Sequence, residues 1–350
     1  MLTDAFFRRY EDVQLFPTFE ERHRRFFVQA AQLITTELFV TNDQGEQSEK
    51  DRVARDLTAA HDQIAREVGA HYLFPPTFVC EQLGVNYKKV FPYTPDFRIT
   101  QYLTAAYEAN FDADQFITRR LSLVELCFQK AAANIASKRS IGEFWAKQVN
   151  KAYGDVIGNF MGTFVEKEKY KFDLLVAAYN RHVTELNERF RQARMPLSYH
   201  NGFIQISDDA LVEAQVERPF WSIVSQPKWQ NVDHLVKEAI DKRDRSERDA
   251  VTPAMQALES VIKIISDEKQ WTTGNERGAA NYINNLVSER NGVRFIEVWE
   301  KDALMDLFGK IRNAFGHGPG SQPLPTLKPQ QTDWAIDAAM IWIKSLVRRL

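Results

Sequence analysis

The chain has little cysteine, no excess of basic charge and no long uncharged apolar run. Its 350 residues include 2 cysteines, Cys80 and Cys127, and neither belongs to a C-x-x-C pair. Both lie in apolar sequence, so we expect free, buried thiols in a reducing compartment. No stretch approaches the roughly 18 uncharged apolar residues of a membrane span. The N-terminus, MLTDAFFRRYED, lacks the apolar centre of a signal peptide. We therefore expect a cytoplasmic protein.

The formal net charge of −2 excludes a general basic surface for nucleic acid. Residues 245–350 carry 14 Lys and Arg against 13 Asp and Glu, so this part of the chain is nearly balanced. Any nucleic-acid site must therefore be a local patch or be assembled from two chains.

Motifs for common cofactors and metals are also missing. The chain has no G-x-x-x-x-G-K-[ST] or G-x-G-x-x-G phosphate loop and no G-x-S-x-G nucleophile turn. The histidines, His182 among them, are scattered through charged helical sequence without ligand spacing, and we expect surface or core histidines there. We therefore expect no cofactor and no metal.

Most of the sequence has the periodicity of α-helices. Apolar residues recur at helical spacing through most of the chain. One such set is Val53, Leu57, Ala60, Ile64 and Val68. The proline-free stretch from 143 to 194 carries a narrow apolar stripe, which predicts one long helix or a helical hairpin.

Two segments depart from this pattern. Prolines at 75–76 and at 92 and 95 predict an irregular region. The segment LSYHNGFIQIS alternates about Asn201-Gly202, which predicts a β-hairpin. We therefore predict an all-α protein in which a small β-hairpin joins two helical domains. The expected boundaries are 1–195 for the N-terminal domain, 196–232 for the hairpin linker and 233–350 for the C-terminal domain.

The last predicted helix runs from a cap at Thr332 to Leu350 and is apolar on almost every side, Trp334 and Ile341 included. A helix that is apolar all round is buried all round. For a terminal helix this pattern indicates a partner subunit.

The run KIRNAFGHGPG, residues 310–320, places an arginine and a histidine at the point where a predicted helix ends. Arg312 lies at the edge of an apolar helical face, and Gly316 can end the helix with positive φ. His317 could then fold back towards the guanidinium. The simpler interpretation is a helix stop, with the arginine placed favourably at the C-terminal end of the dipole.

That pair of side chains suits cleavage of RNA. The 2′-OH must lose a proton and the leaving 5′-oxygen must gain one, which a histidine can do near neutral pH. A planar guanidinium can meet the charge that develops on the phosphorane oxygens with two hydrogen bonds.

The segment IRNAFGH resembles the R-N-x-x-x-H signature of the HEPN superfamily, helical domains that include many metal-independent ribonucleases. Residues 230–350 are also similar to the abortive-infection C-terminal domain of bacterial phage-defence proteins of the AbiJ kind. The similar features are ALESVIK at 257–263, a Thr-Gly turn, the motif itself and the closing apolar helix. The resemblance implies a HEPN-like bundle over 233–350 that forms a homodimer, with two motifs facing one cleft. It also implies that Arg312 and His317 are catalytic and that Asn313 orients the site.

The leading hypothesis is therefore a metal-independent endoribonuclease of a phage-defence, abortive-infection or toxin system. Residues 1–195 would be a sensor or regulatory domain that could bind a further partner, by analogy alone. Two alternatives stay open: a non-catalytic HEPN-type scaffold that binds nucleotide or protein, and a partner-sequestering N-terminal domain with a C-terminal part that only dimerises. Glu259 and Lys263, four apart on one helix, predict an exposed salt bridge or a supporting role near the site.

Overall fold

The computed structural model describes residues 5–39, 47–81, 88–153, 158–207, 212–290, 292–312 and 326–350. It describes the backbone only at Glu81 and Lys88, over 140–153 and 158–168, at Glu213 and Ala214, and at Arg312. The chain divides into two compact units, which meet in sequence between Ile204 and Gln205. Helices dominate both units, and the described strands form two two-stranded pairs. The predicted all-α class with a small β-hairpin is therefore confirmed.

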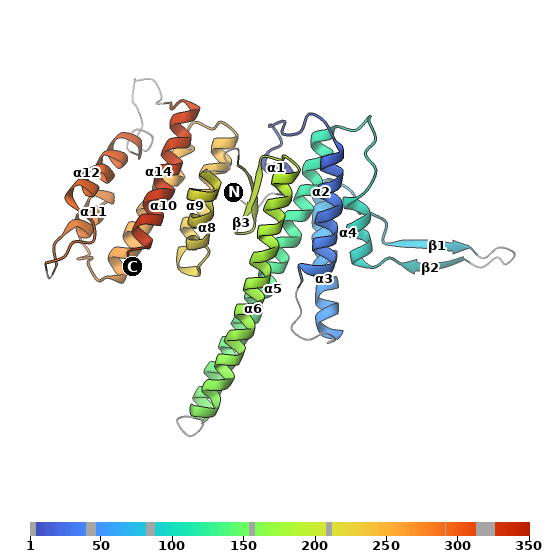
Figure 1. The fold of residues 1–350 in the computed structure, drawn as a ribbon, viewed down its shortest axis with the longest axis horizontal. Helices are drawn as coiled ribbons and strands as arrows, with labels where there is room; N and C mark the ends of the chain where they lie inside the picture. The colour runs from blue at the N-terminus through green and yellow to red at the C-terminus, as the bar shows by residue number, and fades with distance from the viewer. Residues whose placement is uncertain are drawn as a thin grey trace. The chain divides into compact units, whose positions relative to one another are not determined.

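The first unit, residues 5–204, is built on helices (Figure 1). Its elements are α1 (Phe6–Arg9), α2 (Glu21–Gln32), η1 (Leu33–Glu37), α3 (Gln47–Glu67), β1 (Thr77–Glu81), β2 (Lys88–Pro92), α4 (Pro95–Leu103), α5 (Ala113–Tyr153), α6 (Gly158–Gln192), β3 (Leu197–His200) and the first half of β4 (Phe203–Ile206). The element η1 is a π-helix that continues α2 without a break.

The proline-free stretch is a helical hairpin. α5 and α6 lie side by side as two long antiparallel helices (Figure 1). The structure thus decides between the two predictions for this stretch. The base of the hairpin is fixed by buried side chains such as Leu121, Phe128 and Leu186, all of which are fully buried.

A buried ion pair ties the start of the chain to α5 and β4. Arg9 donates to both carboxylate oxygens of Glu125, at 3.0 and 2.6 Å, and to the carbonyl oxygen of Ile204 at 2.9 Å. Glu125 also accepts from the backbone N–H of Ile204 at 2.7 Å. The two side chains are only 1% and 3% exposed, so each charge depends on the other for its compensation.

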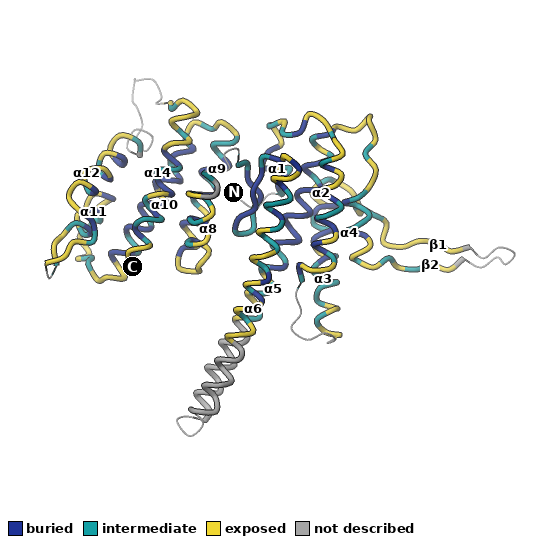
Figure 2. Tube along the Cα trace, in the orientation of Figure 1, coloured by how far each residue is buried: buried dark blue, intermediate teal, exposed yellow. Residues whose placement is uncertain are grey.

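A β-ribbon replaces the irregular region that we predicted around the prolines. β1 pairs antiparallel with β2, and Phe78 lies opposite Phe91 while Val79 lies opposite Val90. These aromatic and β-branched cross-strand pairs stabilise the ribbon, and Pro92 occupies the end of its strand, where a missing N–H is tolerated. Figure 2 shows that the ribbon is mostly exposed.

The prediction of two buried thiols is half correct. Both cysteines are free, but only Cys127 is buried. Cys80 is exposed because it lies on the ribbon, where most of the described side chains are in contact with solvent. Burial raises the pKa of Cys127 to about 12, so its thiol stays protonated and unreactive.

The β-hairpin forms as predicted. β3 pairs with β4, and the connecting residues Asn201 and Gly202 have φ of 44° and 94°. Two consecutive residues with positive φ are what a two-residue hairpin turn requires, and Asn-Gly adopts them at least cost.

The second unit, residues 205–350, is a helical bundle. Its elements are η3 (Glu213–Glu217), α8 (Arg218–Val224), η4 (Pro227–Trp229), α9 (Gln230–Asp244), α10 (Val251–Glu268), α11 (Ala279–Val287), α12 (Val298–Leu307), η5 (Phe308–Arg312) and α14 (Pro329–Val347). α10 is the central helix, since it packs against α9, α11, α14 and η5. Its side chains are buried on most sides, with Leu258, Val261 and Ile262 at 0% exposure.

The last helix, α14, buries one face and exposes another. Ile336, Ala339 and Ile343 are fully buried, whereas Trp334 and Ile341 are 59% and 45% exposed. A single chain therefore does not bury α14 on every side, as the apolar pattern had predicted. The two exposed residues are seven apart, two turns of a helix, so they share a face.

None of the described helices combines the length and the apolar character that crossing a membrane requires.

Candidate active site at the end of η5

Arg312 is the last residue of η5, the π-helical continuation of α12. Asn313 and His317 lie outside the described residues, and Arg312 is described through its backbone alone. The regular α-helix ends at Leu307, and a wider π-turn carries the chain on to Arg312. π-turns are rare and are found frequently at functional sites. That the side chains of Arg312 and His317 lie close together stays a prediction.

The backbone that carries Arg312 is anchored in the core of the unit. Leu304, Leu307 and Phe308 are buried, and Ile311 packs against the same core while staying partly exposed. η5 packs directly on the central helix α10. The apolar face therefore holds the end of η5 in place, and Arg312 follows immediately after its last contact.

The start of α12 is fixed by a clamp from the end of the chain. Arg349 donates to both carboxylate oxygens of Glu300, at 3.1 and 2.6 Å. Glu300 also accepts from the backbone N–H of Glu297 at 2.8 Å, which caps the helix. The Glu300 side chain is 7% exposed and that of Arg349 is 34% exposed. Arg349 and the capping bond together lower the pKa of Glu300 below its ordinary value of 4.5.

This clamp predicts a loss of stability in acid. A carboxyl group whose pKa is lower in the folded state stabilises the protein above its unfolded pKa, and this contribution is lost as pH falls through the folded pKa. At pH 7 the Glu300→Gln variant should be less stable by roughly 1–2 kcal/mol, because solvent screens part of the interaction with Arg349. The difference should shrink once pH falls below the unfolded pKa of about 4.3, and it should vanish as pH passes through the lower pKa of the folded Glu300 carboxyl. Thermal unfolding of both between pH 3 and pH 7 measures this, and a difference that does not change with pH would contradict it.

Glu259 and Lys263 form an ion pair on α10, but it is not the exposed pair that we predicted. The two groups are 2.8 Å apart, and the Glu259 side chain is 9% exposed while that of Lys263 is 43% exposed. The carboxylate is buried because α10 is covered by neighbouring elements on most sides. The Lys263 ammonium also lies 5.6 Å from the centre of the Tyr282 ring, on α11. A buried carboxylate on the helix that supports η5 suits the alternative, a supporting role near the site.

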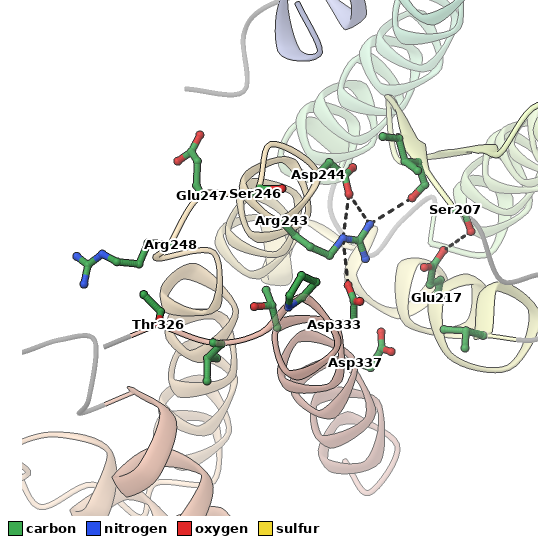
Figure 3. Close-up of a pocket in the computed structure, with 15 residues that line it drawn as sticks. Ser207, Glu217, Arg243, Asp244, Ser246, Glu247, Arg248, Thr326, Asp333 and Asp337 are labelled. Carbon is green, nitrogen blue, oxygen red and sulfur yellow. Dashed lines mark hydrogen bonds and ion pairs between the residues drawn. The ribbon is translucent and has the colours of Figure 1, made fainter. Parts of the chain in front are cut away.

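A cavity of about 630 Å³ lies in the same unit, and residues on α9 and α14 line it (Figure 3). Thr326 and Leu327, which line it, are the first described residues after the segment that contains His317. Five carboxylate side chains and two guanidinium groups line the cavity. Its charge is therefore acidic overall, which disfavours a phosphate group within it.

Arg243 is a partly buried cation that lines this cavity. It lies 2.7 Å from Asp244 and 3.7 Å from Asp333 and donates to the carbonyl oxygen of Ile206 at 3.4 Å (Figure 3). Burial disfavours its charged form, but Asp244, Asp333 and Glu217 outweigh burial and raise the pKa of Arg243 above its ordinary value. Arg243 thus neutralises nearby carboxylates and joins α9 to α14, so it is already committed to structural contacts.

Sequence reasoning missed the one group of described side chains that has metal-ligand geometry. It consists of Glu37, His182 and Glu185, all in the first unit. The only local signal is the spacing of His182 and Glu185 at one helical turn. The third member is far away in sequence, where no spacing rule could find it.

Comparison with protein-family models gives two matches. Residues 4–222 match the model described as AbiJ N-terminal domain 4. Residues 230–350 match the Abi_C model, described as a HEPN-like domain. No curated protein and no solved structure matches the chain. The second match covers the elements from α9 to α14, and therefore the site at the end of η5.

Proposed function

Because the chain belongs to the AbiJ N-terminal domain 4 family and carries a HEPN-like Abi_C domain, we propose that it is a metal-independent endoribonuclease of an abortive-infection system. The two matched domains indicate a role in phage defence. The finer proposal, cleavage of RNA at Arg312 and His317, is carried by one observation. The Arg-Asn-x-x-x-His run begins where the α-helix of the HEPN-like domain has passed into a π-turn anchored on its core.

In the proposed reaction the ribose 2′-oxygen attacks the adjacent phosphorus and the bond from phosphorus to the 5′-oxygen breaks. His317 moves the protons: it takes one from the 2′-OH and passes one to the leaving 5′-oxygen, so the imidazole returns to its starting form. Arg312 stabilises the negative charge on the non-bridging oxygens. Asn313 orients these groups. The products are a 2′,3′-cyclic phosphate and a free 5′-hydroxyl.

The products test this proposal directly. Purified protein in EDTA should cut a labelled single-stranded RNA and leave fragments with a 2′,3′-cyclic phosphate and a 5′-hydroxyl. An analogue with 2′-deoxyribose at the cleaved position should resist, because its nucleophile is missing. Fragments that carry a 5′-phosphate, or cleavage of the deoxy analogue, would contradict the mechanism.

A homodimer is part of the proposal, since two motifs are expected to face one cleft. The exposed face of α14 supports it, because Trp334 and Ile341 form an apolar face that a monomer would leave in water. Large aromatic side chains commonly supply much of the binding energy of an interface.

The variant Trp334→Asp should therefore weaken dimerisation by at least about 30-fold, since interface hot spots contribute about 2 kcal/mol or more. Sedimentation velocity over a range of protein concentrations measures this change. Trp299→Asp is the matched control, because Trp299 is 69% exposed in the same unit but lies on α12. If Trp334→Asp leaves the dimer unchanged, the exposed face of α14 is not part of the dimer interface.

The acidic cavity favours the protein-binding form of a second candidate, a HEPN-type scaffold without turnover. Its five carboxylates suit a cationic partner surface better than a nucleic-acid backbone. Tight binding of a basic partner, together with no cleavage of any RNA, would favour the scaffold over the nuclease.

A further inference from the structure

Two elements of the first unit bring distant polar side chains together. α2 and α6 pack against each other, and the rings of Phe26 and Phe190 stack with centroids 4.8 Å apart. Further along α2 the chain enters η1, whose last residue is Glu37. Glu37 meets α6 at His182, which precedes Phe190 in sequence. Phe26 precedes Glu37 in sequence, whereas its partner Phe190 follows His182, so the two segments are antiparallel.

The π-helix belongs to this arrangement. The backbone N–H of Leu38 donates to the carbonyl oxygen of Leu33 at 2.9 Å, five residues back, in place of the usual four. The wider turn changes the direction of the side chains that follow it, and such turns occur frequently at functional sites. Leu33, Ile34 and Leu38 remain buried, while Glu37 is exposed.

Three potential ligand atoms converge at this place. One atom each from Glu37, His182 and Glu185 lies within 4.8 Å of the other two. His182 and Glu185 are three apart on α6, so they project from one face of that helix. Arg189 donates to Oε1 of Glu185 at 2.8 Å, which orients this carboxylate and leaves Oε2 available.

His182 faces two carboxylates without forming a hydrogen bond to any described residue. Burial, together with the nearby Arg181, lowers the pKa of His182 below 6.5, although Glu37 and Glu185 act in the opposite direction. A neutral imidazole is the form of histidine that binds a metal ion.

We propose that Glu37, His182 and Glu185 form a binding site for one divalent transition-metal ion of the Zn²⁺ class. One imidazole nitrogen and two carboxylate oxygens are ligands that such ions accept, and three protein ligands leave a position for water. The imidazole disfavours Mg²⁺ and Ca²⁺, which prefer oxygen ligands alone. The cations Arg181 and Arg189 reduce the net negative charge, so we expect moderate affinity.

A bound ion would connect η1 to α6, which lie about 145 residues apart along the chain. Because the ion would bind the folded unit, it would raise the stability of that unit with increasing metal concentration. The site lies in the first unit and has no part in the proposed RNA cleavage. Either proposal could therefore fail without affecting the other.

Equilibrium dialysis of the full chain against ZnCl₂, with Mg²⁺ in excess, tests the proposal. The exposed Cys80 could also bind zinc, so the protein should carry Cys80→Ser. We expect one Zn²⁺ per chain and a melting temperature that rises with zinc. The variants His182→Ala and Glu185→Gln should each weaken binding by at least about 100-fold, since even supporting groups around a metal contribute 10- to 100-fold.

Matched controls keep the test specific. His71→Ala removes an exposed imidazole of the same unit, and Glu188→Gln removes a carboxylate three residues further along α6. Both should bind zinc as the wild type does, and all variants should unfold at similar temperatures in EDTA except for small shifts. Absence of zinc binding by the Cys80→Ser protein, or equal binding by His182→Ala and His71→Ala, would overturn the proposal.

Discussion

Alanine in place of Arg312 or His317 should slow RNA cleavage by about 10²- to 10⁴-fold. Proton transfer by a positioned histidine typically contributes this much, and loss of one group that stabilises the transition-state charge costs a similar factor. Single-turnover cleavage of one labelled RNA by wild type and variants measures it. Because both residues act on the same phosphate, the double variant should be scarcely slower than either single variant.

Lys310→Ala is the matched control for this experiment. Lys310 precedes the motif by two residues on η5, its side chain is 74% exposed, and its one ion pair among the described residues is with the exposed Asp306, at 2.9 Å. Removing this cation should change cleavage by no more than a few-fold, since exposed ion pairs contribute little. A large loss in Lys310→Ala would indicate that general positive charge, and not the guanidinium of Arg312, drives the reaction.

The thermal unfolding of the variants separates chemistry from folding. If Arg312 and His317 serve the chemistry and not the packing, the alanine variants at 312 and 317 should unfold within a few degrees of the wild type. Cleavage that persists at the wild-type rate in both variants, with products unchanged, would rule out the assignment of Arg312 and His317. Such a result would leave the family membership and the fold untouched.

The second large effect concerns the first unit. Replacing Glu125 by alanine should destabilise that unit by about 3–5 kcal/mol, because it leaves the buried guanidinium of Arg9 without its counter-charge. It also removes the acceptor of the Ile204 backbone N–H. For a unit of this size the loss corresponds to a fall in melting temperature of about 6–20 °C. Thermal and urea unfolding of the full chain measure the change.

Two further variants show whether the lost charge compensation is the cause. Replacing the buried pair together, as Arg9→Met with Glu125→Leu, should cost less than Glu125→Ala alone, because no unpaired charge remains. Glu11→Ala should have almost no effect, since its ion pair with Arg8 is exposed and 3.4 Å long. If the double variant is as unstable as Glu125→Ala, packing and not charge explains the loss.

Much of the fold follows from local sequence. The periodicity of apolar residues predicts helices because each helix repeats its pattern over neighbouring residues. Asn201-Gly202 predicts its hairpin because two residues with positive φ are a local requirement of the turn. The prolines near the first ribbon were misleading, since one of them is tolerated at the end of β2 while Phe78 and Phe91 pair across the strands.

The helical class and the hairpin were determined by the sequence alone, and the assignment of Arg312, Asn313 and His317 to the site rests on the sequence and stays a prediction. Tertiary structure decided that Cys80 is exposed, that Glu259 is buried, and that Arg9 pairs with Glu125. It also decided that Glu37 meets His182. The physical reason is range: turns and helices depend on residues close in sequence, whereas burial and pairing of charges depend on which distant segments exclude water together.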